Sequence, residues 1–157
     1  MSDKNRPFIL VAEDDEDDVF FLNQAIADMN WSVDLKYVKD GAELIDYLHR
    51  RGAYLSAKGS PFPNLILLDW NLPRKTGWEV LKDVKSNQEL RSIPVVVLST
   101  SRATQDINDV YTLGGNAFAT KPNDFRIFVK SLRDFWFNAA SLPSSAREPL
   151  CSNSSSQ

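Results

Sequence analysis

The fold is decided by residues 65–73, which read LILLDWNLP. Four consecutive apolar residues before an aspartate are typical of a strand that is buried on both faces of a parallel sheet. Two other runs have the same form: FILVA at residues 8–12 ends before an acidic block, and VVVL at residues 95–98 ends at Ser99. These runs predict three central strands, each followed by a polar side chain.

Helical patterns alternate with the strand patterns along the rest of the chain. Apolar residues recur every three or four positions in several segments, which is the spacing of one helix face. The expected helices lie near residues 19–29, 40–51, 78–85, 107–111 and 125–135, and two further strands lie near 32–38 and 117–119. Asp40 and Glu43 have the spacing of a capping box at the start of the second helix. Five strand–helix alternations predict an α/β fold: a five-stranded parallel sheet with helices on both faces.

Length and composition fit a single globular domain. The chain has 157 residues, of which 43% are hydrophobic and 25% charged, and its net charge of −3 excludes a globally basic surface for nucleic acid. No stretch approaches the ~20 apolar residues of a membrane helix. The lone Cys151 excludes an internal disulfide and fits a reducing compartment. We therefore expect a soluble, cytoplasmic protein that binds neither nucleic acid nor membrane, with one domain over residues 7–140 and flexible termini at 1–6 and 141–157.

The residues that follow the strands carry the candidate chemistry. They are Glu13 and Asp14, Asp69, Ser99 and Lys121, and parallel strands bring such positions to one edge of the sheet. Clustered carboxylates without histidine or cysteine are typical Mg²⁺ ligands, and a carboxylate can itself accept a phosphoryl group. Each residue alone has an ordinary explanation, such as a helix start, a turn or a cap. Their joint occurrence at the strand ends favours phosphoryl transfer onto Asp69.

This set of residues resembles the receiver domain of two-component response regulators over residues 7–137. The resemblance implies a flavodoxin-like sheet in the order 2-1-3-4-5 and makes Asp69 the phosphoacceptor. Ser99 matches the hydroxyl that follows the phosphoryl group on activation, and Lys121 matches the lysine that pairs with the phosphoryl oxygens. Phosphate would then come from a histidine kinase.

The resemblance also implies a Mg²⁺ site and a switch. Asp14 would be the direct ligand, Glu13 its acidic partner through a metal-bound water, and Asn71 would offer its backbone carbonyl. The neighbouring Asp15 leaves room for a shift of one position, and we prefer Asp14 because Glu13 begins the strand end.

Three further positions belong to this comparison. Phe118 matches the aromatic switch residue, and Pro122 matches the cis proline that follows the lysine. Thr100 departs from the pattern, because the family often has a smaller residue there, and it could restrict access of the phosphodonor.

A narrower resemblance points to a subfamily. PFPNLILLD at residues 61–69, DFW at 134–136 and Leu142-Pro143 are similar to the small response regulators that are paired with cyanobacterial phytochromes. This implies a phytochrome-type histidine kinase as partner. Only about twenty residues follow the last helix, so we expect no output domain and a signal that leaves by contact with a downstream protein.

Aromatic residues are unusually dense in the last helix. Four of its apolar side chains are expected to face the core: Phe125, Phe128, Leu132 and Phe135. Trp136 and Phe137 would then be left at the end of this stripe. They could fold back against their own domain, but exposed aromatic residues commonly mark contacts, and we favour a contact. We therefore expect a homodimer that forms through the C-terminal aromatic segment.

Two other classes of protein remain open. A phosphohydrolase of the haloacid-dehalogenase type also uses an aspartate after a strand, but it needs a second aspartate where this chain has Asn71. A degenerate receiver that acts only as a binding module is the other alternative, and the presence of all the site residues argues against it. The lone histidine, His49, is expected on the solvated surface.

Overall fold

A computed structural model of the protein describes residues 6–57 and 61–143. Five strands alternate with five α-helices, and a 3₁₀ helix and a π-helical segment complete the regular structure. The strands are β1 (Phe8–Ala12), β2 (Asp34–Val38), β3 (Leu65–Asp69), β4 (Val95–Ser99) and β5 (Ala117–Thr120). The helices are α1 (Glu16–Asp28), α2 (Gly41–His49), η1 (Gly52–Ala57, 3₁₀), α3 (Gly77–Ser86), α4 (Thr104–Thr112), α5 (Phe125–Ser131) and η2 (Leu132–Ala139, π).

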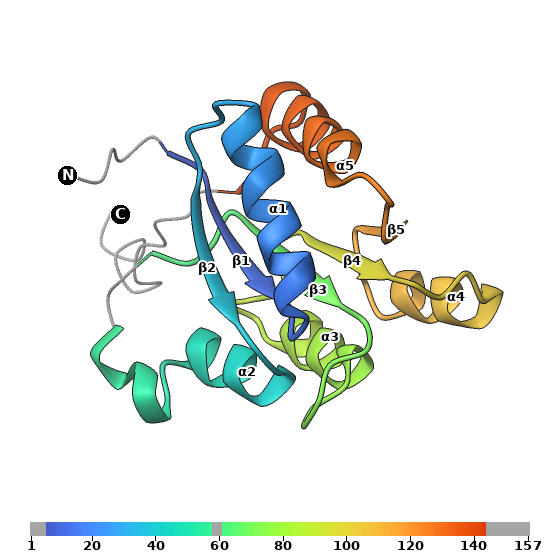
Figure 1. Ribbon diagram of the computed structural model, residues 1–157. Helices are drawn as coiled ribbons and strands as arrows, with labels where there is room; N and C mark the ends of the chain where they lie inside the picture. The colour runs from blue at the N-terminus through green and yellow to red at the C-terminus, as the bar shows by residue number, and fades with distance from the viewer. Residues whose placement is uncertain (1–5, 58–60, 144–157) are drawn as a thin grey trace, which may run out of the picture.

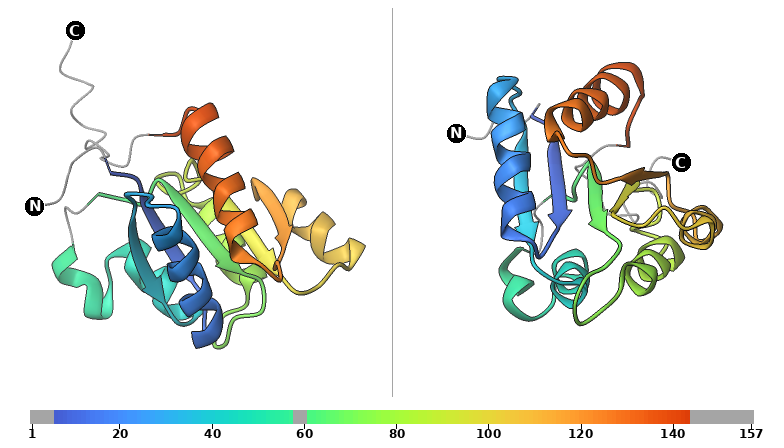
Figure 2. Two further views of the ribbon diagram at one scale, coloured as in Figure 1. Left: turned by 45° about the horizontal axis from the view of Figure 1, so that its top comes forward. Right: turned by 45° about the vertical axis from the view of Figure 1, so that its right-hand side comes forward.

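The strands form one parallel sheet in the order β2-β1-β3-β4-β5, as the sequence predicts. Helices α1 and α5 pack side by side on one face, whereas α2, α3 and α4 cover the other (Figures 1 and 2). The order reverses between β1 and β3, which are neighbours in the sheet although β2 lies between them in the chain. In such sheets, binding sites form at the carboxyl ends of the strands beside this reversal.

Successive residues of the central strands face opposite sides of the sheet and build two cores. Ile66 and Leu68 of β3 pack with the apolar faces of α2, α3 and α4. Leu65 and Leu67 pack with those of α1 and α5. All five residues of β3 are buried, which explains why the strand reads as a continuous apolar run.

Local sequence explains where the second helix begins and ends. The Asp40 side chain accepts a hydrogen bond from the Glu43 backbone N–H at 2.7 Å, as a capping box requires. The Glu43 carboxylate instead accepts from the backbone N–H of Lys39 at 2.9 Å, one residue earlier than expected. The helix ends at His49, earlier than the expected residue 51, because Arg50 adopts a left-handed conformation with φ of 55°.

The expected arrangement of the C-terminal aromatic residues is wrong in one respect. The helical spacing predicts Phe135 in the core-facing stripe, yet it is 59% exposed. Trp136 and Phe137 instead pack against the core, and the Phe137 ring lies edge-on to Trp31 at a centroid distance of 5.3 Å. The chain becomes π-helical after α5, and a π-helix has more residues per turn than an α-helix. The side chains that face the core after the buried Leu132 are therefore those of Trp136 and Phe137, and Phe135 faces outward.

Two surface expectations also need comment. His49 is not simply solvated, because its Nε2 lies 2.8 Å from Asp83 Oδ2 and links α2 to α3. Trp78 lies in the predicted third helix but is 40% exposed, so the buried face is built by other residues. Most of the termini that were expected to be flexible, 1–6 and 141–157, lies outside the described residues, and Cys151 lies there too.

Candidate functional site

Four strand ends meet at one edge of the sheet and carry the residues selected from the sequence. Glu13 and Asp14 follow β1, Asp69 ends β3, Ser99 ends β4 and Lys121 follows β5. Because these strands are parallel neighbours, their carboxyl ends lie next to one another. The fold alone therefore gathers side chains that are more than a hundred residues apart in the chain.

Three carboxylates form the centre of the site. Glu13, Asp14 and Asp69 each place an oxygen within 4.8 Å of the others. Glu13 and Asp69 are buried whereas Asp14 is exposed. Burial raises the pKa of Glu13 to about 7; the nearby charge of Asp69 also raises it, and a hydrogen bond from Lys121 opposes the shift. Such crowding of acidic oxygens fits a hard divalent cation such as Mg²⁺.

Lys121 is the cation of the described site. Its Nζ lies 2.9 Å from Glu13 Oε2, 3.2 Å from Asp69 Oδ2 and 2.8 Å from Asp18 Oδ2. Burial lowers the pKa of Lys121, but its hydrogen bonds to Asp18 and Glu13 and the charge of Asp69 raise it by more, so the pKa is well above its usual range. The ammonium is therefore fixed beside Asp69, where it can neutralise negative charge that develops there.

Asp18 is a site residue that the sequence analysis missed. It lies in the first turn of α1, four residues after Asp14 and 103 residues before Lys121. An acidic residue in a first helical turn is commonly explained by its favourable interaction with the helix dipole. The sequence therefore offers no reason to expect a contact with Lys121. The contact joins residues 103 positions apart, and no local spacing distinguishes Asp18 from the other acidic residues of the block at 13–18.

The preference for Asp14 over Asp15 agrees with the structure. Asp15 is the N-cap of α1, and its carboxylate accepts hydrogen bonds from the backbone N–H groups of Asp17 and Asp18. These hydrogen bonds occupy Asp15 Oδ1 at the start of the helix. Asp14, by contrast, contributes an oxygen to the acidic cluster.

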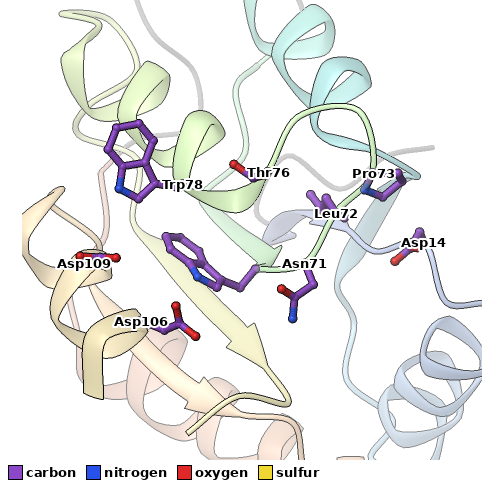
Figure 3. Close-up of a pocket in the computed structure, with 9 residues that line it drawn as sticks. Asp14, Asn71, Leu72, Pro73, Thr76, Trp78, Asp106 and Asp109 are labelled. Atoms are coloured by element: carbon purple, nitrogen blue, oxygen red, sulfur yellow. The ribbon is translucent and has the colours of Figure 1, made fainter. Parts of the chain in front are cut away.

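Asn71 lies where the β3–α3 loop leaves the site. Its backbone N–H donates to Asp69 Oδ1 at 3.1 Å, which fixes one oxygen of that carboxylate. The loop lines an open cleft of about 600 Å³. Figure 3 shows this cleft running from Asp14 past Asn71 to Asp106 and Asp109 of α4.

Ser99 is fully buried at the end of β4. Its Oγ accepts a hydrogen bond from the Ser101 backbone N–H at 3.0 Å, so the hydroxyl proton remains available as a donor. The hydrogen bonds found among residues 6–57 and 61–143 do not join Ser99 to Asp69. Thr100, the next residue, is exposed.

The two remaining positions are Phe118, which lies in β5, and Pro122, which follows the strand by two residues. Phe118 is half-buried against the core that faces α3 and α4, and its backbone N–H donates to the Tyr111 hydroxyl at 3.2 Å. The expectation of a cis bond before Pro122 is wrong: across the described part of the chain every peptide bond is trans, that of Lys121–Pro122 included.

The order of the sheet, the acidic triad and the lysine beside the central aspartate are together those of a receiver-type signalling module. The chain belongs to the response regulator receiver domain family, whose sequence model matches residues 9–133. The triad of Glu13, Asp14 and Asp69 is the acidic cluster typical of that family.

Individual relatives match nearly the whole chain. Response regulator Rcp1 of Synechocystis sp. is 37% identical over 148 residues, which cover 91% of this chain and 99% of the relative. The solved structure of the phosphorylated cyanobacterial phytochrome response regulator RcpA is 39% identical, with a TM-score of 0.81 and coverage of 88% and 99%. The Mn²⁺-bound form of Rcp1 is 36% identical, with a TM-score of 0.79 and coverage of 87% and 99%. The subfamily resemblance seen in the sequence is thereby confirmed.

Among the helices of residues 6–57 and 61–143, none is both long enough and apolar enough to cross a bilayer.

Proposed function

We propose that this protein is a phosphorylation switch in which Asp69 accepts a phosphoryl group from a phosphohistidine of a histidine kinase. One observation carries the proposal: Asp69, a buried carboxylate within an acidic triad, has the Lys121 ammonium 3.2 Å from its Oδ2. A nucleophilic oxygen and a fixed positive charge at that distance suit attack on phosphorus.

The transfer step follows from these groups. An Asp69 oxygen forms a bond to phosphorus while the bond from phosphorus to the donor imidazole nitrogen breaks, and the nitrogen keeps the electron pair. Lys121 neutralises charge on the phosphoryl oxygens, and Ser99 can donate its hydroxyl proton to one of them. The carboxylates of Glu13, Asp14 and Asp69 and the Asn71 carbonyl would hold Mg²⁺, which supplies further charge neutralisation when bound.

The partner we propose is a phytochrome-type histidine kinase. Support comes from the relatives, since RcpA is described as a cyanobacterial phytochrome response regulator and aligns with 88% of this chain. Transfer from such a kinase would take place in the cytoplasm, and one cysteine in 157 residues fits that reducing compartment.

We propose that phosphorylation biases Ser99 and Phe118 and thereby α4, β5 and α5, and that the signal leaves by contact with a downstream protein. A second copy of the chain would bind through the C-terminal aromatic segment. The exposed Phe135 of η2 and Ile127 of α5 are its most accessible apolar side chains. Sedimentation of the wild type and of Phe135→Ser tests this: a variant that is folded and associates equally well would exclude the interface.

Phosphorylation assays separate the proposal from its alternatives. Wild-type protein and Asp69→Asn are incubated with labelled acetyl phosphate and Mg²⁺. We expect label on the wild type only, because an amide is neither nucleophilic nor anionic. An unlabelled wild type would favour the degenerate binding module. Multiple turnover of a small phosphomonoester would favour the phosphohydrolase, although Asn71 stands where such an enzyme needs an acid/base aspartate.

A further inference from the structure

Lys121 divides its contacts between two kinds of carboxylate. Glu13 and Asp69 belong to the acidic triad, whereas Asp18 lies outside it on α1. We propose that Asp18 is a positioning residue for Lys121: it holds the ammonium beside Asp69 while a divalent cation occupies the triad. This inference rests on the proposed role of Asp69 as phosphoacceptor.

Asp18 makes a contact with Lys121 that is as short as those of the triad carboxylates. Its Oδ2 lies 2.8 Å from Nζ, compared with 2.9 Å for Glu13 and 3.2 Å for Asp69. The lysine side chain is only 11% exposed, so water can replace little of this interaction. An ammonium has three N–H donors, and three carboxylate oxygens lie within 3.2 Å of this one.

A cation at the triad and Lys121 would both use the carboxylates of Glu13 and Asp69. Glu13 and Asp69 would each have to turn an oxygen to the cation, and the ammonium would then be repelled by a like charge. Asp18 is the one carboxylate of the three that stays free to hold Lys121. Without it, the lysine would either block the triad or leave the site.

Asp17 provides a matched control on the same helical turn. It carries the same charge and the same benefit from the helix dipole. Asp17 is exposed, and within the described residues its carboxylate makes no hydrogen bond or ion pair; its backbone N–H donates to Asp15 Oδ1 at 2.8 Å. A general effect of acidic charge would therefore appear for both residues, whereas an effect through Lys121 would appear for Asp18 alone.

The first test is a Mg²⁺ titration followed by tryptophan fluorescence, since Trp70 adjoins Asp69. We expect Asp18→Asn to weaken Mg²⁺ binding by about tenfold, Asp17→Asn by about threefold or less, and Asp18→Glu to restore most of the affinity. In a Lys121→Met background, the effect of Asp18→Asn should fall to that of the Asp17 control, because no lysine is left to compete. Equal losses in both backgrounds would overturn the inference.

The second test is the rate of phosphorylation by acetyl phosphate at saturating Mg²⁺. We expect Asp18→Asn to be several-fold slower than the wild type and Asp17→Asn to be unchanged. If Asp18→Asn were phosphorylated at the wild-type rate or faster, the positioning role would be overturned. Such a result would mean that Asp18 only draws the Lys121 ammonium away from the phosphoryl group. A wild type that takes up no label, or an Asp69→Asn that is labelled equally, would refute the acceptor assignment instead. The Mg²⁺ titration would still test Asp18 in that case.

Discussion

Replacing Lys121 with methionine should destabilise the metal-free protein. The change keeps an unbranched side chain that reaches as far as the lysine Cε but removes an ammonium that contacts Glu13, Asp18 and Asp69 at 2.8–3.2 Å. Removing one partner of a buried ionic cluster typically costs about 3–5 kcal/mol, because the remaining charges lose their compensation. Asp18 retains 21% exposure, so we expect the lower end, about 3 kcal/mol. At a urea m-value of about 2 kcal/mol/M, the midpoint would fall by about 1.5 M.

The assay is urea unfolding of the wild type and of Lys121→Met, with and without Mg²⁺. Mg²⁺ should stabilise the variant more than the wild type, because the lysine no longer competes for Glu13 and Asp69. If Mg²⁺ binds the variant about tenfold more tightly, the additional stabilisation at saturation is about 1.4 kcal/mol. The loss without Mg²⁺ should be larger at pH 8 than at pH 6, since Glu13 can take up a proton at the lower pH and relieve the repulsion.

Two results would refute this reasoning. A variant as stable as the wild type without Mg²⁺ would show that the ionic contacts are offset by their desolvation cost. Equal stabilisation of both proteins by Mg²⁺ would show that lysine and cation do not share the carboxylates. Lys130→Met is a suitable control, because its ion pair with Asp134 is on the exposed surface and should contribute little.

Further predictions concern the triad, the C-terminal segment and the loop after β3. The pKa of Glu13 is about 7 in the folded protein and 4.5 ordinarily, so its contribution to stability is fully present below about pH 4.5 and is lost as the pH rises through 7. The loss is about 3 kcal/mol at most, and calorimetry of Glu13→Gln should show a flatter profile. Phe137→Ala should lower the free energy of unfolding by about 2 kcal/mol, whereas Phe135→Ser should leave it within about 0.5 kcal/mol; the reverse order in urea titrations would contradict the π-helical segment. Gly77→Ala should cost about 1–3 kcal/mol, since a Cβ there would lie 2.6 Å from the Trp70 ring and 2.9 Å from its backbone, and wild-type stability by thermal unfolding would exclude that close approach.

The sheet and its edge were predictable from the sequence because the strands are buried on both faces. LILLD at residues 65–69 has no polar interruption, and its end coincides with the strand end in the structure. The same reasoning placed Glu13, Asp14, Asp69 and Lys121 together, since parallel strands leave little freedom in where their carboxyl ends lie.

What escaped prediction depends on contacts between distant elements or on irregular helix geometry. The contact of Asp18 with Lys121 spans 103 residues, and nothing local distinguishes Asp18 from its acidic neighbours. The helical period of 3.6 residues placed Phe135 in the core. That period does not apply where the backbone becomes π-helical, so Trp136 and Phe137 turn inward instead.

The central claim is that Asp69 forms an acyl phosphate. Its most direct test is borohydride reduction of phosphorylated protein, which converts an aspartyl-phosphate to homoserine, followed by peptide sequencing by mass spectrometry. We predict homoserine at position 69 only, and only when Mg²⁺ and a phosphodonor were both present. Homoserine at Asp14 or Asp18, or phosphate retained on the His49 imidazole with residue 69 unchanged, would contradict the account.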